Sequence, residues 1–244
     1  MQWSEMNKKL ERIIKDLYQT FSIYPLKGNI EGCPCCVSNS DKSNLHSKPL
    51  KELNSEDLSR FSFKAMSTFG GVDDFKHFLP RILELSVNDE LDVDEFIVLG
   101  KLDYGKWNDW PVNEQESIRE LLLHWWCFQI NNKSGFDLFL FVEIAKKLND
   151  FTKMLDCWET AVESIGFVNL IEFIEFHFSN LTYGAEEFKE WNKKQLNEFK
   201  MWINLKSGLI EKGFFHYESL DKSLAESASN ALYILEVLSK QPNQ

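Results

Sequence analysis

The sequence has no run of about 18 uncharged apolar residues, the length that a membrane-spanning helix needs. Its beginning also lacks the continuous apolar core and the small-residue cleavage pattern of a secretory signal. We therefore expect a cytoplasmic protein. In a reducing compartment, clustered cysteines more often bind metal or carry out thiol chemistry than form permanent disulfides.

The common catalytic motifs are absent as well. The chain contains no Gly-x-x-x-x-Gly-Lys, no Gly-x-Gly-x-x-Gly, no His-Glu-x-x-His and no Gly-x-Ser-x-Gly. It also lacks the Glu-x-x-His motif that carboxylate-bridged metal sites place on bundle helices. These absences remove the usual nucleotide-binding and hydrolase explanations, and they favour a protein that is not an enzyme.

Positive charge is scarce. The 27 lysines and arginines are outnumbered by 38 aspartates and glutamates, which gives a formal net charge of −11. The acidic residues are spread along the chain, and a field of this sign repels phosphate backbones and anionic lipid surfaces. We therefore expect neither nucleic-acid nor membrane binding, and we predict a protein partner.

Apolar and aromatic residues are abundant. Hydrophobic residues make up 43% of the chain, with 20 Phe and 8 Trp, which is too much apolar bulk for a disordered protein and predicts an aromatic-rich core. The first helix is predicted from a one-sided apolar stripe of Leu10, Ile13, Ile14, Leu17 and Phe21.

The pattern predicts an all-α protein, either an irregular multi-helix bundle or stacked helix pairs that resemble an α-solenoid. No linker indicates a domain boundary, so residues 1–244 are predicted to form a single domain. Residues 170–178 partly alternate and allow a strand, but their helical neighbours favour a helix. Helices after the long loop are predicted from Ser55 to Gly70-Gly71, from residue 72 with a kink or new start at Pro80, and near 93–103, 114–130, 136–149, 151–164, 167–181, 186–206 and 219–239.

Residues 22–53 are predicted to form a long loop, and such loops inside compact domains are usually functional or fixed by something. Within it, Cys33 and Cys36 have the Cys-Pro-x-Cys spacing that turns two thiolates toward one ion. His46 follows as a third donor, and zinc suits such a mixture of sulfur and imidazole ligands.

A structural zinc site usually has four protein ligands. The fourth ligand is either Cys35, which adjacency to Cys36 makes sterically awkward, or His77, which would tie the loop to the helical body. We therefore predict a zinc site drawn from these residues, and we expect the bound ion to hold the loop in place.

Two other interpretations of the cysteines stay open: buried structural thiols, and redox or nucleophilic chemistry. In the second, Cys35 is the free thiol and His46 or His77 is the base or a metal ligand. No strand precedes the Cys-x-x-Cys, so a thioredoxin-like site is not favoured. Cys127 and Cys157 lie in apolar helical stretches, where we expect them to pack as small apolar side chains.

Other residues with chemical potential have simpler structural explanations. Asp73 and Asp74 have metal-ligand spacing with His77, but acids that open a helix usually cap it. Five aromatic residues lie close together in the sequence, and we expect them to pack in the core and not to form a binding cage or an interface anchor. They are Tyr104, Trp107, Trp110, Trp125 and Trp126.

Three segments, YPLKGNIEGCPCCVS, LSRFSFKAMSTFGGVDDFKHFLPRILEL and GKLDYGKWNDWP, together resemble a family of uncharacterised bacterial proteins. The resemblance covers roughly the first half of the chain. It implies no activity and no catalytic roles. It does imply that Cys33, Cys36 and His77 belong to one shared region, which is compatible with a common site.

Overall fold

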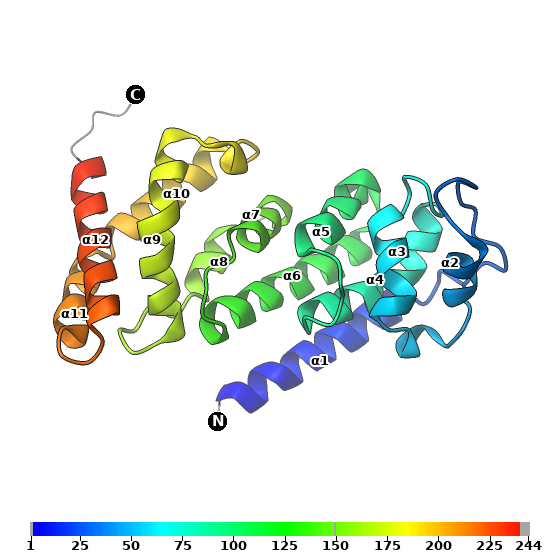
Figure 1. Ribbon diagram of the computed structural model, residues 1–244, viewed down its shortest axis with the longest axis horizontal. Helices are drawn as coiled ribbons and strands as arrows, with labels where there is room; N and C mark the ends of the chain where they lie inside the picture. Colours follow the sequence, from blue (N-terminus) through cyan, green and yellow to red (C-terminus); the bar gives the residue numbers. More distant parts are fainter. Residues whose placement is uncertain (1, 149, 240–244) are drawn as a thin grey trace. The chain divides into compact units, whose positions relative to one another are not determined.

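The computed structural model describes residues 2–148 and 150–239. These residues form twelve α-helices and three short 3-10 helices with no strand, which confirms the all-α prediction (Figure 1). They gather into two compact units, one ending at Trp125 and the other beginning at Trp126. That the whole chain behaves as one domain stays a prediction. Among the described residues, no helix combines the length and apolarity that a bilayer span requires.

The first unit is built around α1, which packs against α4. The apolar stripe of α1 is buried as predicted, with Leu17 and Phe21 almost fully enclosed. The elements that begin in this unit are α1 (Gln2–Phe21), α2 (Asn39–Asn44), η1 (Leu50–Glu52), α3 (Ser55–Lys64), α4 (Val72–Val87), α5 (Glu95–Tyr104), η2 (Trp107–Asp109) and α6 (Val112–Asn132).

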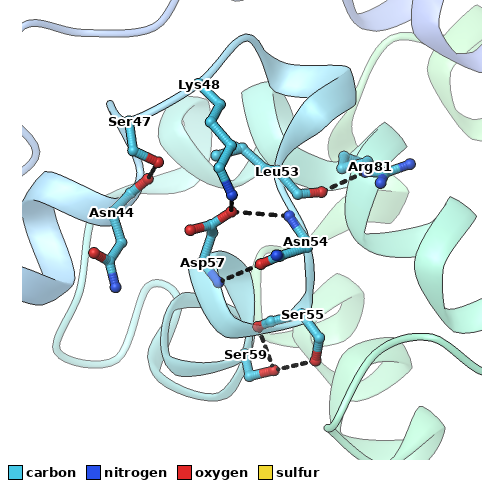
Figure 2. Close-up of polar contacts among 9 residues, drawn as sticks. All are labelled: Asn44, Ser47, Lys48, Leu53, Asn54, Ser55, Asp57, Ser59 and Arg81. Carbon is cyan, nitrogen blue, oxygen red and sulfur yellow. Dashed lines mark hydrogen bonds and ion pairs between the residues drawn. The ribbon is translucent and has the colours of Figure 1, made fainter.

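Reciprocal capping fixes the start of α3. The Asn54 side chain accepts a hydrogen bond from the Asp57 backbone N–H at 3.1 Å, and the Asp57 carboxylate accepts one from the Asn54 N–H at 3.0 Å. Figure 2 shows this pair together with Lys48, whose ammonium lies 2.8 Å from the same carboxylate. Because the free amides at the helix start are satisfied locally, the chain enters α3 in one defined direction.

Helix α4 runs without interruption through Pro80, so neither a break nor a new start occurs there. Of the two acids that open this helix, Asp74 acts as the capping interpretation predicts, because its carboxylate accepts a hydrogen bond from the Gly71 N–H at 2.8 Å. Gly70 precedes the helix with a φ of 67°, a left-handed conformation that glycine adopts without steric penalty.

The loop of residues 22–53 contains more structure than its sequence suggests. It includes α2 and η1, and it buries four apolar side chains, Ile30, Val37, Leu45 and Leu53. The loop is therefore held by contacts of its own, and whether a bound ion also holds it in place stays a prediction. Ordinary burial and backbone hydrogen bonding fix it, as described for the cysteine turn below.

The second unit has an aromatic core, as the composition predicts. Trp126, Phe136, Phe141 and Trp158 contact one another with ring centroids 4.8–6.3 Å apart. After the end of α6, its elements are α7 (Leu138–Lys147), α8 (Thr152–Asp156), α9 (Ile165–Tyr183), η3 (Glu186–Phe188), α10 (Lys193–Asn204), α11 (Ser207–Tyr217) and α12 (Lys222–Ser239). Helix α12 packs against both α9 and α11 (Figure 1).

The structure confirms the helix over residues 170–178, which lie inside α9. It shortens the helix predicted at 151–164 to α8 and divides the one at 186–206 into η3 and α10. Helix α11 lies between the helices predicted at 186–206 and 219–239, and the sequence pattern did not reveal it.

Cys127 and Cys157 form a disulfide, which corrects the expectation that they pack as free apolar side chains. The bridge joins α6 to the residue that follows α8. Asn131 reinforces this junction, because its side-chain amide donates to the carbonyl oxygens of Cys127 and Cys157 at 2.9 and 2.7 Å. Pairing between cysteines 30 residues apart is set by tertiary structure and cannot be deduced from spacing.

Removing this disulfide is expected to destabilise the protein. A bridge across 30 residues restricts the unfolded chain, and chain entropy puts its contribution at about 3.5 kcal/mol. We expect the Cys127→Ala/Cys157→Ala variant to lose about that much unfolding free energy in urea denaturation. A reductant should lower the stability of the wild type similarly and leave the variant unchanged. Equal stability of the oxidised wild type and the variant would contradict a stabilising disulfide.

Candidate metal centre

Cys33, Pro34, Cys35 and Cys36 form a tight turn in the first unit. The backbone N–H groups of Cys36 and Val37 both donate to the carbonyl oxygen of Cys33, each at 2.9 Å. Pro34 suits the second position of such a turn, because its ring fixes φ and it has no N–H to leave unpaired. The turn directs three sulfur atoms toward one another from four consecutive residues.

Backbone pairing holds the turn against the segment between α3 and α4. The Cys33 N–H donates to the Thr68 carbonyl at 2.8 Å, and the Gly70 N–H donates to the Glu31 carbonyl at 2.7 Å. The Arg60 guanidinium, from α3, donates to the Cys36 carbonyl at 2.8 Å. These bonds fix the backbone before any ion binds, so the turn is preorganised.

The three sulfur atoms lie close enough to share one ion. The Sγ of Cys35 is 2.9 Å from that of Cys33 and 3.5 Å from that of Cys36, and all three lie within 4.8 Å of one another. Thiolates bound tetrahedrally to zinc at about 2.3 Å stand about 3.8 Å apart. Small side-chain rotations therefore suffice to place the sulfurs around a metal ion.

The two predicted imidazole ligands do not belong to this cluster. Among the described residues, the group of side chains positioned to hold a metal contains Cys33, Cys35 and Cys36 only. His46 is exposed just after α2. His77 lies on α4 with its Nδ1 2.8 Å from the Tyr24 carbonyl oxygen and its ring edge-on to Phe78. The complete predicted ligand set, with either imidazole, stays a prediction.

Cys35, which the sequence placed second because it neighbours Cys36, has the central position. Its thiol approaches both of the other sulfurs, while Cys33 and Cys36 are half-buried on either side. The presence of three cysteines within four residues was the sequence signal for Cys35 as a ligand. We discounted Cys35 because adjacent cysteines have difficulty in binding one ion, but the turn lets all three side chains point the same way.

The hydrogen bonds within the cluster separate the pKa values of its thiols. The pKa of Cys33 is lowered below its usual value because its sulfur accepts hydrogen bonds. The largest effect comes from the Cys35 thiol, then from the Cys35 backbone amide, and then from the Cys36 thiol. The Cys35 proton is held by the neighbouring sulfurs of Cys33 and Cys36, which raises the pKa of Cys35 to about 11. In the metal-free protein, Cys33 therefore becomes a thiolate at a lower pH than Cys35.

Alkylation of the metal-free protein is therefore expected to be selective. Since only the thiolate is nucleophilic, iodoacetamide at pH 7 should modify Cys33 before Cys35. The Cys35 rate should keep rising as the pH approaches about 11, where its thiol loses the proton. Tandem mass spectrometry of the labelled peptide measures both rates. Faster modification of Cys35 than of Cys33 at pH 7 would contradict this order.

Comparison with known protein families, with curated proteins and with solved structures gives no match to this chain. The fold and the sulfur cluster therefore define the class of the protein: an all-α protein with a surface turn of three cysteines that can hold a metal ion.

Proposed function

We propose that this chain is a helical interaction protein without enzymatic activity, and that its cysteine turn binds zinc in a structural site. The observation that carries the proposal is the convergence of three sulfur atoms within 4.8 Å on a turn that is already fixed by backbone hydrogen bonds. Sulfur donors in this number select soft or borderline ions, of which zinc is suited to a tetrahedral sulfur-rich site.

Three thiolates leave a fourth coordination position to be filled. The turn lies at the surface, with Cys35 exposed, so a side chain of a protein partner can reach the ion. We propose that a partner supplies this fourth ligand and that zinc thereby strengthens the complex. The net charge of −11 favours a partner with a basic surface around its ligand residue.

The alternative, a metal- or thiol-dependent enzyme that uses Cys35 with His46 or His77, has less support. Neither imidazole belongs to the sulfur cluster among the described residues, so neither is positioned to take the Cys35 proton. That proton is also held between two neighbouring sulfurs, which makes Cys35 a poor nucleophile at neutral pH.

Cobalt(II) in place of zinc tests the open position, because its visible absorption spectrum reports the ligands around it. We expect imidazole added to the cobalt-loaded protein to change that spectrum by entering the fourth position. A spectrum that imidazole leaves unchanged would indicate four ligands from the chain itself and would contradict a partner-completed site. His46→Ala and His77→Ala variants would then show which imidazole closes the shell.

A further inference from the structure

A second site in the first unit is a groove with a volume of about 670 Å³. The end of α1, the residues just after it, η1 and the middle of α4 line this groove. Its volume falls in the range of about 300–1,000 Å³ that is typical of small-molecule sites. None of the three cysteines lines it, so an inference about the groove does not depend on metal binding.

Aromatic rings and prolines give the groove apolar walls. Tyr18 and Tyr24 both line it, but each donates its hydroxyl hydrogen to a carboxylate of the protein. Tyr18 donates to Glu84 at 2.6 Å and Tyr24 donates to Glu114 at 2.5 Å. Because these hydroxyl hydrogens are used internally, the tyrosines present mainly ring surface to a ligand. Apolar lining is completed by Phe21, Pro25, Pro49, Leu50 and Pro80.

Polar contacts on both sides fix the η1 wall. Before η1, Lys48 pairs with Asp57 at 2.8 Å, and after it the Leu53 carbonyl accepts a hydrogen bond from the Arg81 Nε at 2.7 Å (Figure 2). Arg81 also binds Glu84 at 2.7 Å, which is the carboxylate that accepts the Tyr18 hydroxyl. The groove is therefore largely preformed, which reduces the entropy lost when a ligand binds.

Two lysines give the groove a charge opposite to that of the whole chain. Lys51 holds its ammonium 4.7 Å from the centroid of the Tyr18 ring, and Lys15 lines the groove from α1. Neither forms an ion pair with a carboxylate of the described residues. Glu52 is the one acidic residue in the lining, so the fixed charges of the groove sum to +1 with His77 neutral. In a protein of net charge −11, this local excess is selective for anions.

His77 adds a polar group with a defined orientation. Its Nδ1 donates to the Tyr24 carbonyl at 2.8 Å, which fixes the tautomer and leaves Nε2 for other partners. His77, which the sequence suggested as a metal ligand, thus lines the groove beside its apolar walls.

We propose that this groove binds a small organic carboxylate with an apolar, preferably aromatic, body. The tyrosine and proline surfaces receive the apolar body, and the ammonium groups of Lys15 and Lys51 attract the carboxylate. Apolar walls with a few convergent polar groups are the usual construction of a small-molecule site.

Isothermal titration calorimetry with 4-phenylbutyrate as the probe tests this proposal on the full-length protein. We expect saturable 1:1 binding, with the neutral analogue 4-phenylbutan-1-ol at least about tenfold weaker, because two ammonium groups at about 0.7 kcal/mol each favour the carboxylate. Inorganic phosphate, which lacks an apolar body, should not bind detectably. Equal affinity for the acid and the alcohol would overturn the assignment of an anion site, and binding of phosphate alone would overturn the need for an apolar body.

Matched lysine variants locate the binding site. Lys51→Met should raise the Kd of 4-phenylbutyrate about threefold, and Lys15→Met/Lys51→Met about tenfold, as the two contributions add. Lys9→Met, which removes an exposed lysine from α1 outside the groove, should leave the Kd unchanged. An equal effect of Lys9→Met would show non-specific attraction and overturn the proposal. Cys33→Ser should also bind normally, which separates this site from the proposed metal site.

Discussion

Lys76→Met is expected to lower the free energy of unfolding by about 4 kcal/mol, because it leaves a buried carboxylate without its counter-charge. The Lys76 ammonium lies 2.6 Å from the Glu114 carboxylate, and the two side chains are 6% and 0% exposed. Tyr24 also donates to Glu114, and the ammonium lies 4.3 Å from the centroid of the Trp110 ring. Urea denaturation at pH 7 measures the loss.

The double variant Lys76→Met/Glu114→Gln is the matched comparison. It removes both charges, so it should recover a large part of the stability that the single variant loses. Lys9→Met provides an exposed control and should change stability by less than about 0.5 kcal/mol. If Lys76→Met lost no more than about 1 kcal/mol, the pair would behave as an exposed ion pair and the buried network would be contradicted.

Cys33→Ser/Cys36→Ser is expected to reduce zinc affinity by about 10⁴-fold. Mutation of a residue that only hydrogen-bonds to a metal ligand lowers metal affinity by about 10- to 100-fold. Loss of a ligand itself should cost at least the upper value, so we take about 100-fold for each lost thiolate. Competition with a chromophoric chelator under reducing conditions measures the change. The reductant keeps the three free cysteines available to the ion.

Cys127→Ser/Cys157→Ser is the control for this experiment, because it removes two cysteines that pair with each other outside the cluster. It should leave zinc affinity unchanged, and because the reductant also opens the Cys127–Cys157 bridge of the wild type, the two proteins are compared without that bridge. An unchanged affinity in the Cys33→Ser/Cys36→Ser variant would contradict the assignment of the metal to the turn.

The helices that the sequence predicts well are those with one buried face. On α1, the apolar stripe that includes Leu10, Leu17 and Phe21 in the sequence is the face that is buried in the structure. Helix α2 was not predicted because it has no buried residue and therefore no apolar period. Its available signal was the capping box between Ser38 and Asp41, which marks a helix start without hydrophobic residues.

The part of the candidate site that could be predicted from the sequence is the part formed by residues close together in the chain. Cys33, Cys35 and Cys36 converge because of a turn whose geometry depends on neighbouring residues, so spacing was sufficient to find them. The imidazole ligands depended on tertiary placement, which spacing does not encode, and His77 lies instead with Tyr24 beside the groove. The Cys127–Cys157 disulfide was missed for the same reason.

Because the metal site is formed by a single turn, the role we expect for the ion differs from the loop-fixing role predicted from the sequence. All three sulfurs come from one turn, so an ion bound by them alone cannot tie the long loop to a distant element. Backbone hydrogen bonds to the Thr68 carbonyl and from the Gly70 N–H, together with the Arg60 side chain, already hold the turn in place. Metal removal is therefore expected to change partner binding more than the stability of the isolated chain.

X-ray absorption spectroscopy of the zinc-loaded protein tests the metal centre most directly, because it counts sulfur ligands and measures their distances. We predict one zinc ion per chain with three sulfur neighbours at about 2.3 Å and one nitrogen or oxygen neighbour at about 2.0–2.1 Å. A shell composed of nitrogen and oxygen alone would contradict the account.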